Sequence, residues 1–369
     1  MGSRFGRYLI ERKVAVGGMA EIYEARTTSG LKVAIKKIHP DLASQPKFVQ
    51  MFLDEARIVI RLRHPHVVQL LDFGKLAGTY FFSLEWVDGK ALSEIIIRQR
   101  QMEIPFPPDV ALIIGADICE GLHYAHNRAD QFDRPLNIIH RDVSPSNIMV
   151  TREGMSKVTD FGIADIREKG TQTQPGIIRG KFSYMSPEQS RGHFLDRRSD
   201  VFSLGIVLYE TLLSTRLFLR EKETETIEAV RKCQVPSMRA VRGDISASLE
   251  AATLKALTAS VRVRHASAAE FGISLREVLR SEYPKSNRTT VARFLKLLFP
   301  DEEFAGADHP LPAPSWQTPS VVTLEAKPVA WSERLLARRY AASLGLGIGA
   351  VAAAELWARF GHRLLAMLR

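Results

Sequence analysis

Alternating hydrophobic and polar positions dominate the first part of the chain and predict a β-sheet. Residues 8–25 fit two strands around a glycine turn, and residues 33–36 form the next strand. Residues 67–73 and 80–84 read as two further strands. We therefore expect a five-stranded antiparallel sheet near the start of the chain.

One helix is expected within this sheet region, over residues 47–63. Its apolar stripe lies at helical spacing and consists of Phe48, Phe52, Val59 and Leu62. Glu55 lies on the same stripe, where a carboxylate needs a partner because burying it alone costs several kcal/mol. Strand alternation puts Lys36 on one face with the small Ala34, so Lys36 is a candidate partner. The alternative is that Glu55 is a solvated residue at the helix edge.

The chain from about residue 88 to residue 300 reads as mainly helical, so the fold class is α+β. Helices are expected over 109–127, 201–213, 246–280 and 289–299. The helix over 201–213 is apolar nearly all round, which predicts a central, buried position. A proline-rich, polar stretch over 301–328 is typical of a linker, and an apolar segment lies within 329–369.

Composition changes this picture only a little. Of the 369 residues, 45% are hydrophobic and 25% are charged, which indicates a mostly globular chain. The net charge is +10, but the sequence has no zinc-ligand spacing, RNP motif or basic–aromatic array, so we expect no nucleic-acid partner. The two cysteines are far apart, as expected in a reduced cytosolic compartment. The polar N-terminus predicts no secretory signal.

Two loops carry the candidate chemistry. The catalytic loop, residues 140–147 (His-Arg-Asp-Val-Ser-Pro-Ser-Asn), follows a short apolar run, and the second loop, residues 158–162 (Val-Thr-Asp-Phe-Gly), lies downstream. Asp142 can accept a proton from a hydroxyl, and the amide oxygen of Asn147 can hold a hard cation. Asp160 adds a second carboxylate. Phosphoryl transfer needs such a set, with a base for the nucleophile and oxygen ligands for Mg²⁺.

Together with Val33-Ala34-Ile35-Lys36, these loops resemble the protein-kinase family, over about residues 7–280. They are most similar to bacterial kinases of the eukaryotic, or Hanks, serine/threonine type. The resemblance implies two lobes, a sheet lobe over 1–87 and a helical lobe over 88–300, with ATP and Mg²⁺ (or Mn²⁺) between them. It also implies transfer of the γ-phosphoryl group to serine or threonine hydroxyls of protein substrates, in bacterial signalling.

The resemblance also assigns roles at the centre of the site. Asp142 is expected to orient and deprotonate the substrate hydroxyl, and Asn147 and Asp160 to hold metal. Lys36 is expected to bind the α- and β-phosphates and to pair with Glu55.

The nucleotide-binding residues follow from the same resemblance. The glycine turn matches the family's glycine-rich loop only at Gly17, because Ala15 and Ala20 replace the outer two glycines. The expected contacts of this turn are Val14, Ala15, Val16, Gly17, Gly18, Met19, Ala20, Glu21 and Ile22. Further adenine contacts are expected from Ala34, Met149 and the connecting hinge at Glu85 and Val87.

Two departures from the family pattern occur together. The family usually has lysine two positions after the catalytic aspartate, where this chain has Ser144, and threonine where this chain has Lys181. Our hypothesis is an exchange in which Lys181 supplies the cation near the γ-phosphate and Ser144 supplies the hydroxyl. The exchange leaves serine/threonine versus tyrosine preference open.

The segment from Asp160 to Glu188 is the activation segment by resemblance. We expect autophosphorylation at Thr171 or Thr173, because Arg141 could bind the new phosphate. A homodimer would bring one copy to the other for this reaction. The alternative is that these loop threonines stay unmodified. Resemblance also pairs Glu188 with Arg264. Asp200 is expected to accept N–H groups from the catalytic loop.

The segment over 340–358 leaves three alternatives open: a membrane-spanning helix, an interfacial or partner-binding helix, and a soluble helix. A spanning helix needs about 20 apolar residues, and the uncharged run is shorter than this. A spanning helix would anchor a cytoplasmic kinase domain to the inner membrane.

Two other functions compete with a protein kinase. A non-catalytic pseudokinase scaffold is favoured only by the thinned glycine turn. A small-molecule phosphotransferase could share the His-x-Asp loop, but the long activation segment favours a protein substrate.

Overall fold

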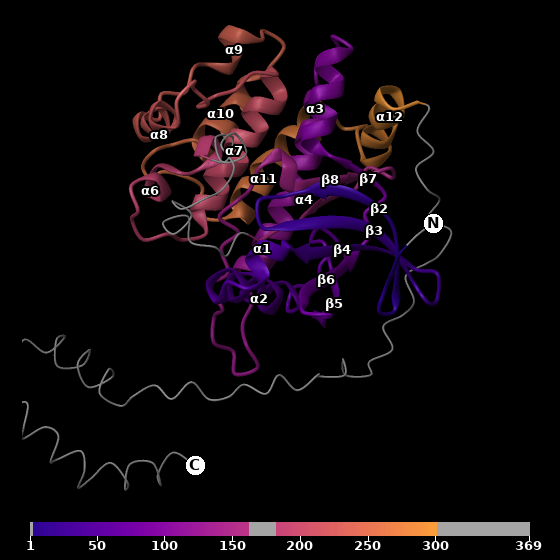
Figure 1. Cartoon of the computed structure of the whole chain (residues 1–369). Helices are drawn as coiled ribbons and strands as arrows, with labels where there is room; N and C mark the ends of the chain where they lie inside the picture. The colour runs from indigo at the N-terminus through magenta and orange to yellow at the C-terminus, as the bar shows by residue number, and fades with distance from the viewer. Residues whose placement is uncertain (1–2, 162–181, 301–369) are drawn as a thin grey trace, which may run out of the picture. The chain divides into compact units, whose positions relative to one another are not determined.

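The computed structural model describes residues 3–161 and 182–300. Within these residues the chain forms a sheet lobe followed by a larger helical lobe (Figure 1). The expected two-lobed arrangement is therefore present. The linker over 301–328 and the apolar segment over 340–358 lie outside the described residues.

The sheet of the small lobe has six strands among the described residues, in the order β1-β2-β3-β4-β6-β5, and every neighbouring pair is antiparallel. The strands are β1 (Ser3–Phe5), β2 (Tyr8–Val16), β3 (Ala20–Thr27), β4 (Lys32–Ile38), β5 (Leu70–Leu76) and β6 (Thr79–Glu85). The expectation of five strands was wrong. The extra strand β1 pairs with the start of β2 across a tight turn in which Gly6 has a φ of +56°.

Two helices accompany this sheet, and not one as expected. They are α1 (Pro40–Ala43) and α2 (Pro46–Val59). Each begins with a proline in its first turn, where the missing N–H has no helical partner to lose. Pro46 therefore starts a new helix after α1 ends. Phe52 of α2 stacks on Phe82 of β6 with ring centroids 3.9 Å apart. This contact fixes α2 against the sheet.

The large lobe is mainly helical. Its longer helices are α3 (Leu92–Gln101), α4 (Pro108–His126), α7 (Arg198–Leu213), α8 (Glu223–Lys232), α10 (Ala247–Ala256), α11 (Ala268–Glu282) and α12 (Arg288–Leu298). Shorter ones are α6 (Pro187–Ser190), α9 (Met238–Val241) and the 3₁₀ turns η1 (Pro145–Asn147) and η3 (Phe182–Tyr184). All residues of α7 from Ser199 to Leu212 are buried, which confirms its predicted central position. The region over 246–280 is two helices because Ser267 caps a new one, accepting the Glu270 N–H.

The large lobe also contains a small antiparallel sheet. It contains β7 (Gly89–Ala91), β8 (Ile148–Thr151) and β9 (Ser156–Val158). A Cβ on Gly89 would lie 2.0 Å from the carbonyl oxygen of Val150, so only glycine allows this close approach. The segment leaving β6 is thereby held against the strand that follows the catalytic loop.

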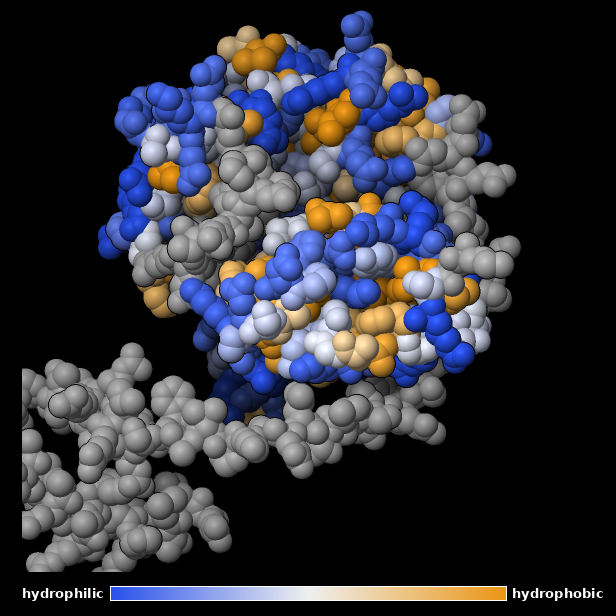
Figure 2. All heavy atoms as spheres, in the orientation of Figure 1, coloured by the Kyte–Doolittle hydropathy of each residue, from blue (hydrophilic) through white to orange (hydrophobic). Residues whose placement is uncertain are grey.

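The surface shown in Figure 2 is mostly hydrophilic, with hydrophobic residues in small separate groups. Among the described residues, none of the helices combines the length and the apolar character needed to cross a bilayer.

Candidate active site

Lys36 lies at the centre of a three-residue ionic contact. Its Nζ lies 2.7 Å from Oε1 of Glu55 on α2 and 2.9 Å from Oδ1 of Asp160, which follows β9. Burial alone would lower the pKa of Lys36, but Asp160 and Glu55 outweigh it, so the pKa is raised. The structure thus brings together three residues that the sequence singled out, and the ammonium stays charged.

Asp200, at the start of α7, holds the backbone of the catalytic loop. Its carboxylate accepts the N–H groups of His140 and Arg141, each at 2.8 Å, and contacts His126 Nε2 at 2.7 Å. Asp200 is fully buried. Burial alone would raise its pKa, but the contact with His126 and the loop N–H groups lower it. These bonds support Arg141 at a φ of +67°, a conformation that non-glycine residues rarely adopt.

His140 connects the catalytic loop to the second loop. Its Nδ1 accepts the Asp142 N–H at 3.2 Å, and its Nε2 lies 3.0 Å from the carbonyl oxygen of Thr159. Burial lowers the pKa of His140, so the ring is neutral and its Nε2–H donates to Thr159. The ring also packs against Phe161, with centroids 4.5 Å apart. The backbones around Asp142 and Asp160 are therefore held in one unit.

Asn147 and Asp160 provide oxygen ligands of the type that Mg²⁺ prefers. The Asn147 Nδ2 donates to the Asp142 carbonyl oxygen at 2.7 Å, which leaves the amide oxygen as the atom for a cation. The Asn147 carbonyl oxygen accepts the Thr159 N–H at 3.0 Å, beside Asp160, whose φ is +56°. The donor set fits a metal that binds through two protein groups and completes its shell with water and phosphate oxygens.

The glycine turn connects β2 and β3 as expected. Gly17 N–H donates to the Ala20 carbonyl oxygen at 2.8 Å, and His39 Nε2 lies 2.7 Å from the Gly17 carbonyl oxygen. Ile22 pairs with Lys36 across the β3–β4 ladder. The Glu21 carboxylate contacts Lys13 and Tyr23, each at 2.5 Å, so these bonds tie its side chain to the strands. The remaining residues expected at the nucleotide lie at the end of β2 (Val14, Ala15 and Val16) and in the turn (Gly18 and Met19), and their contact with a nucleotide stays a prediction.

At the hinge, the Glu85 side chain and N–H are already used. The Glu85 N–H donates to Gln69 O at 2.9 Å, and its carboxylate lies 2.8 Å from Lys157 Nζ. Of the Glu85 groups, the carbonyl oxygen then remains to accept a hydrogen bond from an adenine edge. The backbone of Val87, two residues on, is the other expected contact. Ala34 lies opposite Leu84 in the β4–β6 ladder, and Met149 lies opposite Ala91 in the small sheet.

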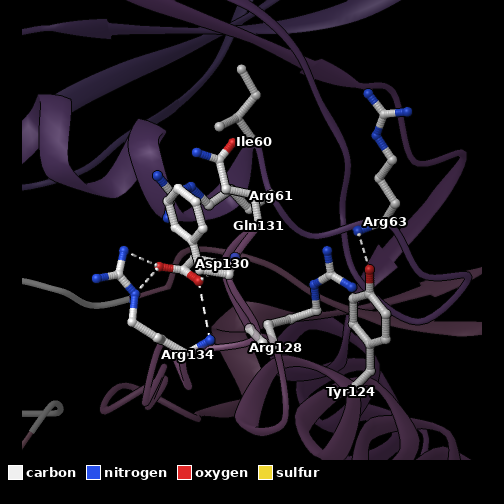
Figure 3. A pocket seen from close by; sticks show the side chains of 10 residues that line it. Ile60, Arg61, Arg63, Tyr124, Arg128, Asp130, Gln131 and Arg134 are labelled. Atoms are coloured by element: carbon white, nitrogen blue, oxygen red, sulfur yellow. Dashed lines mark hydrogen bonds and ion pairs between the residues drawn. The ribbon is translucent and has the colours of Figure 1, made fainter. Parts of the chain in front are cut away.

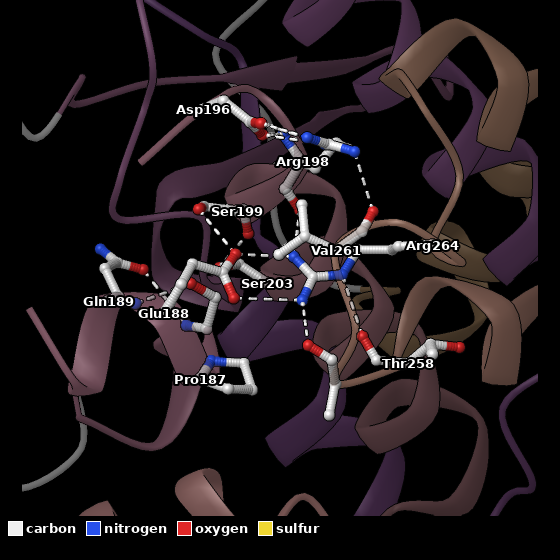
Figure 4. A network of polar contacts seen from close by, with 12 residues as sticks. Pro187, Glu188, Gln189, Asp196, Arg198, Ser199, Ser203, Thr258, Val261 and Arg264 are labelled. Carbon is white, nitrogen blue, oxygen red and sulfur yellow. Dashed lines mark hydrogen bonds and ion pairs between the residues drawn. The ribbon is translucent and has the colours of Figure 1, made fainter. Parts of the chain in front are cut away.

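The end of the activation segment is held by a buried ion pair (Figure 4). Arg264 donates to both oxygens of Glu188, at 2.7 and 3.1 Å, and its side chain is fully buried. Ser199 Oγ donates to Glu188 at 2.8 Å. The neighbouring Gln189 donates to the Arg141 carbonyl oxygen at 2.9 Å, which ties this segment to the catalytic loop.

Two departures from the family pattern and two threonines were expected in or near the site. Lys181, Thr171 and Thr173 lie outside the described residues. Ser144 is buried at the start of η1, where its carbonyl oxygen accepts the Asn147 N–H at 3.0 Å. The exchange of Ser144 and Lys181 therefore stays a hypothesis.

Sequence reasoning missed three contributors, His39, His126 and Gln189. Each contacts a backbone atom or a buried carboxylate far away in the sequence. The one available signal was a histidine at the end of a mostly apolar helix, which points to a buried partner for His126.

Comparisons with known proteins agree with this geometry. A family model described as "Protein kinase domain" matches residues 8–290. The kinase domain of Mycobacterium tuberculosis PknI, in a crystal structure, superposes with a TM-score of 0.57 at 26% identity, covering 75% of this chain and 98% of that one.

Curated relatives carry two kinds of name. Tyrosine-protein kinase MasK of Myxococcus xanthus is 37% identical over 306 residues, which is 81% of this chain and 47% of MasK. Serine/threonine-protein kinase PknB of Mycolicibacterium smegmatis is 35% identical over 322 residues, 84% of this chain and 49% of that protein. Serine/threonine-protein kinase PrkC of Bacillus subtilis is 31% identical over 308 residues, 82% of this chain and 46% of PrkC. The chain spans about half the length of these relatives, and it belongs to the protein kinase family.

Proposed function

We propose that the chain is an ATP- and Mg²⁺-dependent protein kinase that phosphorylates serine or threonine hydroxyls of proteins. The observation that carries this proposal is the contact of Lys36 Nζ with both Glu55 and Asp160, at 2.7 and 2.9 Å. This contact supplies a fixed cation beside a carboxylate that can hold metal. Catalysis of phosphoryl transfer consists mainly of such positioning and charge neutralisation.

Each residue then has a definite task. Lys36 donates to oxygens of the α- and β-phosphates, and Glu55 keeps its ammonium directed into the cleft. Asn147 and Asp160 hold the metal, which when bound neutralises charge on the phosphate oxygens. The glycine turn and the hinge backbone of Glu85 and Val87 position the nucleotide.

The chemical step needs only one proton acceptor from the chain. The substrate hydroxyl oxygen forms a bond to the γ-phosphorus while the bond between that phosphorus and the β–γ bridging oxygen breaks. ADP carries away the electron pair of the broken bond, and Asp142 accepts the hydroxyl proton. The hydrogen bonds from Asp200 to the loop support Asp142 in its place through the His140 and Arg141 backbone.

Tyrosine is the second candidate acceptor, because one relative is named a tyrosine-protein kinase and two are named serine/threonine-protein kinases. The Ser144 and Lys181 departures also affect this part of the site. Phosphoamino-acid analysis after incubation with labelled ATP distinguishes the two. Phosphoserine or phosphothreonine supports our first choice, and phosphotyrosine alone overturns it.

We also propose autophosphorylation at Thr171 or Thr173, between two copies of the chain. A phosphate there would bring an anion to Arg141 beside the catalytic aspartate. Phosphosite mapping of active enzyme tests this proposal, which would fail if neither threonine were modified. Mixing active chain with Asp142→Asn chain shows whether one copy modifies another.

The competing functions have distinct outcomes in the same assays. A pseudokinase scaffold would bind ATP without transferring phosphate to any acceptor. A small-molecule phosphotransferase would consume ATP only when a low-molecular-weight acceptor is added and would leave protein unlabelled.

A further inference from the structure

A pocket of about 700 Å³ is lined by none of the residues expected to contact the nucleotide (Figure 3). Its walls come from the turn that follows α2, the last turn of α4 and the connection over 128–137. This connection is a small hairpin, in which Ala129 and Pro135 form a β-bridge and the Leu136 N–H donates to the Arg128 carbonyl oxygen at 2.8 Å. The pocket is therefore built from ordered backbone on all three sides.

The lining is strongly basic. Four arginines, at 61, 63, 128 and 134, line the pocket together with one carboxylate, that of Asp130. Asp130 accepts from Arg134 Nε at 2.8 Å and from the N–H groups of Phe132 and Arg134 at 2.8 and 3.0 Å. These bonds hold the carboxylate within the hairpin. Its charge acts on Arg134 and also on Arg61, so the lining keeps an excess of positive charge, with four arginines to one carboxylate.

Arg128 has a buried hydrogen-bond donor without an acceptor among the described residues. Its Nε is buried and has no hydrogen-bond partner within the described part of the chain. The guanidinium carbon lies 5.3 Å from the centroid of the Tyr124 ring, which holds the side chain but accepts no strong hydrogen bond. A buried donor without an acceptor is unfavourable, and an anion that binds against the Arg128 guanidinium would supply an acceptor.

Arg61 faces the same space and is exposed. Among the described residues its charge interacts with the Asp130 carboxylate, and no closer ion pair or hydrogen bond holds the Arg61 side chain. A guanidinium group presents its N–H donors in a planar fork that matches carboxylate and phosphate oxygens. The pocket uses arginine and no lysine, which favours a ligand with planar or tetrahedral oxyanions.

The lining also offers apolar contact. Phe132 at the hairpin tip is 66% exposed, and Ile60 lines the opposite wall. A free inorganic anion would use neither side chain. A polypeptide that carries an acidic residue beside an apolar one would use both.

The position of the pocket relates it to the active site. Ile60 and Arg61 follow α2 directly, and α2 carries Glu55. The Arg63 N–H lies 3.0 Å from Tyr124 Oη, so this turn already rests on α4. The hairpin leads within a few residues to His140 and the catalytic loop. A ligand here would connect the helix that presents Glu55 to the loop that presents Asp142.

We propose that this arginine pocket binds an acidic segment of a protein, in which carboxylates or a phosphate lie next to an apolar side chain. Binding of this segment does not depend on the proposed function. The effect on activity does rest on it: by fixing the end of α2, the bound segment favours the Lys36–Glu55 contact and raises kinase activity.

The test uses the full chain and labelled peptides of equal length. One peptide is rich in glutamate and leucine, a second has phosphoserine in place of the glutamates, and a third has lysine there. We expect one or both anionic peptides to bind, with affinity falling as salt rises, and the lysine peptide not to bind. Which anionic peptide binds more tightly identifies the oxyanion. Equal binding of all three, or of none, overturns the proposal.

Variants then place the binding site. Arg61→Glu should weaken binding about tenfold or more, which corresponds to about 1.4 kcal/mol. Arg128→Gln should weaken it as well. The matched control is Arg280→Glu, an exposed arginine on α11, which should bind like the parent chain. Thermal melts establish that the variants are folded. Weakening by Arg280→Glu as large as by Arg61→Glu contradicts the placement.

Two further readouts separate the parts of the proposal. Single-stranded DNA that binds more tightly than either peptide, and loses binding with Arg61→Glu, would overturn a protein ligand. Saturating peptide should raise the rate of phosphate transfer in the parent chain and not in Arg61→Glu. Binding without any change in rate would refute the link to α2, while absence of phosphate transfer under all conditions would refute the proposed function and leave the binding result intact.

Discussion

Two ionic contacts in this chain differ in how deeply they are buried and in how many bonds hold them. In the cleft, Lys36 makes one contact to Glu55 and one to Asp160, and these carboxylates remain 19% and 32% exposed. In the large lobe, Arg264 contacts both oxygens of Glu188, and their side chains are 0% and 9% exposed. Arg264 also donates to the carbonyl oxygens of Thr258 and Arg198, at 3.1 and 2.8 Å (Figure 4).

This difference in burial and bonding suits a contact that takes part in catalysis in the first case and one that stabilises the fold in the second. A lysine ammonium whose two carboxylate partners are both partly exposed can exchange one of them for a phosphate oxygen without leaving a fully buried charge unpaired. A bidentate arginine with further carbonyl acceptors has no such freedom, because each lost bond would leave a buried polar group unpaired. We therefore expect the cleft contact to control activity and the Glu188–Arg264 pair to control stability.

The largest effect on stability should follow Arg264→Ala. It leaves the Glu188 carboxylate buried without its cation, and breaking a buried pair in this way costs about 3–5 kcal/mol. Chemical denaturation of the two proteins measures this loss. The control is Arg198→Ala, whose ion pair with Asp196 is 30% and 37% exposed and should contribute about 1 kcal/mol or less. Equal losses for both variants would show that burial does not distinguish the pairs.

Lys36→Ala should remove most activity with a much smaller loss of stability. We expect phosphate transfer to fall about 10²–10³-fold, as when other fixed donors to a transition state are removed. Labelled-ATP assays and thermal melts on the same samples measure both effects. The neighbouring Lys37, which packs over the Phe5 and Tyr23 rings, supplies the control Lys37→Ala. A loss of stability as large as that of Arg264→Ala would make Lys36 a structural residue.

Glu55→Gln should have an intermediate effect on activity. The amide keeps the shape and one hydrogen-bond acceptor but removes the charge that holds Lys36, so we expect a loss of about 10-fold to 100-fold. Steady-state kinetics over a range of ATP concentrations measure it. An unchanged rate and unchanged KM for ATP would mean that the contact with Glu55 is not needed in the active state.

The smallest effect concerns pH. Burial alone would raise the pKa of Glu188, but the contacts with Arg264 and Ser199 outweigh it, so the folded-state pKa lies below its ordinary value. The pair therefore stabilises the fold above the unfolded-state pKa, about 4.3, and this contribution is lost as the pH falls through the lower folded-state pKa. Between about pH 5 and 3, the free energy of unfolding should fall more steeply in the parent chain than in Glu188→Gln. Parallel slopes would contradict this assignment.

The sequence predicted these two ionic contacts better than it predicted the details of the fold. Glu55 lies on an apolar helical stripe and Lys36 lies on a strand face, and both patterns indicate a buried charge that needs a partner. The pairing of Glu188 with Arg264 followed from family resemblance. In contrast, β1 has three residues and α1 has four, which are too short for a hydrophobic period to be recognised.

Other features were beyond sequence reasoning for a physical reason. His39 and Gln189 act on backbone carbonyl oxygens, and backbone positions are set by the fold and not by residue spacing. The arginine pocket is another example, because residues 128–137 read only as a polar connection until the hairpin brings Arg128 and Arg134 opposite Arg61.

We propose that the residues around Lys36 and Asp142 carry out phosphoryl transfer. The most direct measurement compares the parent chain with Asp142→Asn, recording ATP binding and the single-turnover rate of label transfer to protein. We predict that both proteins bind ATP with Mg²⁺ and that transfer falls about 10²–10⁴-fold in the variant, as expected for loss of a general base. Undiminished transfer by Asp142→Asn, or ATP binding without transfer by the parent chain, would contradict the claim.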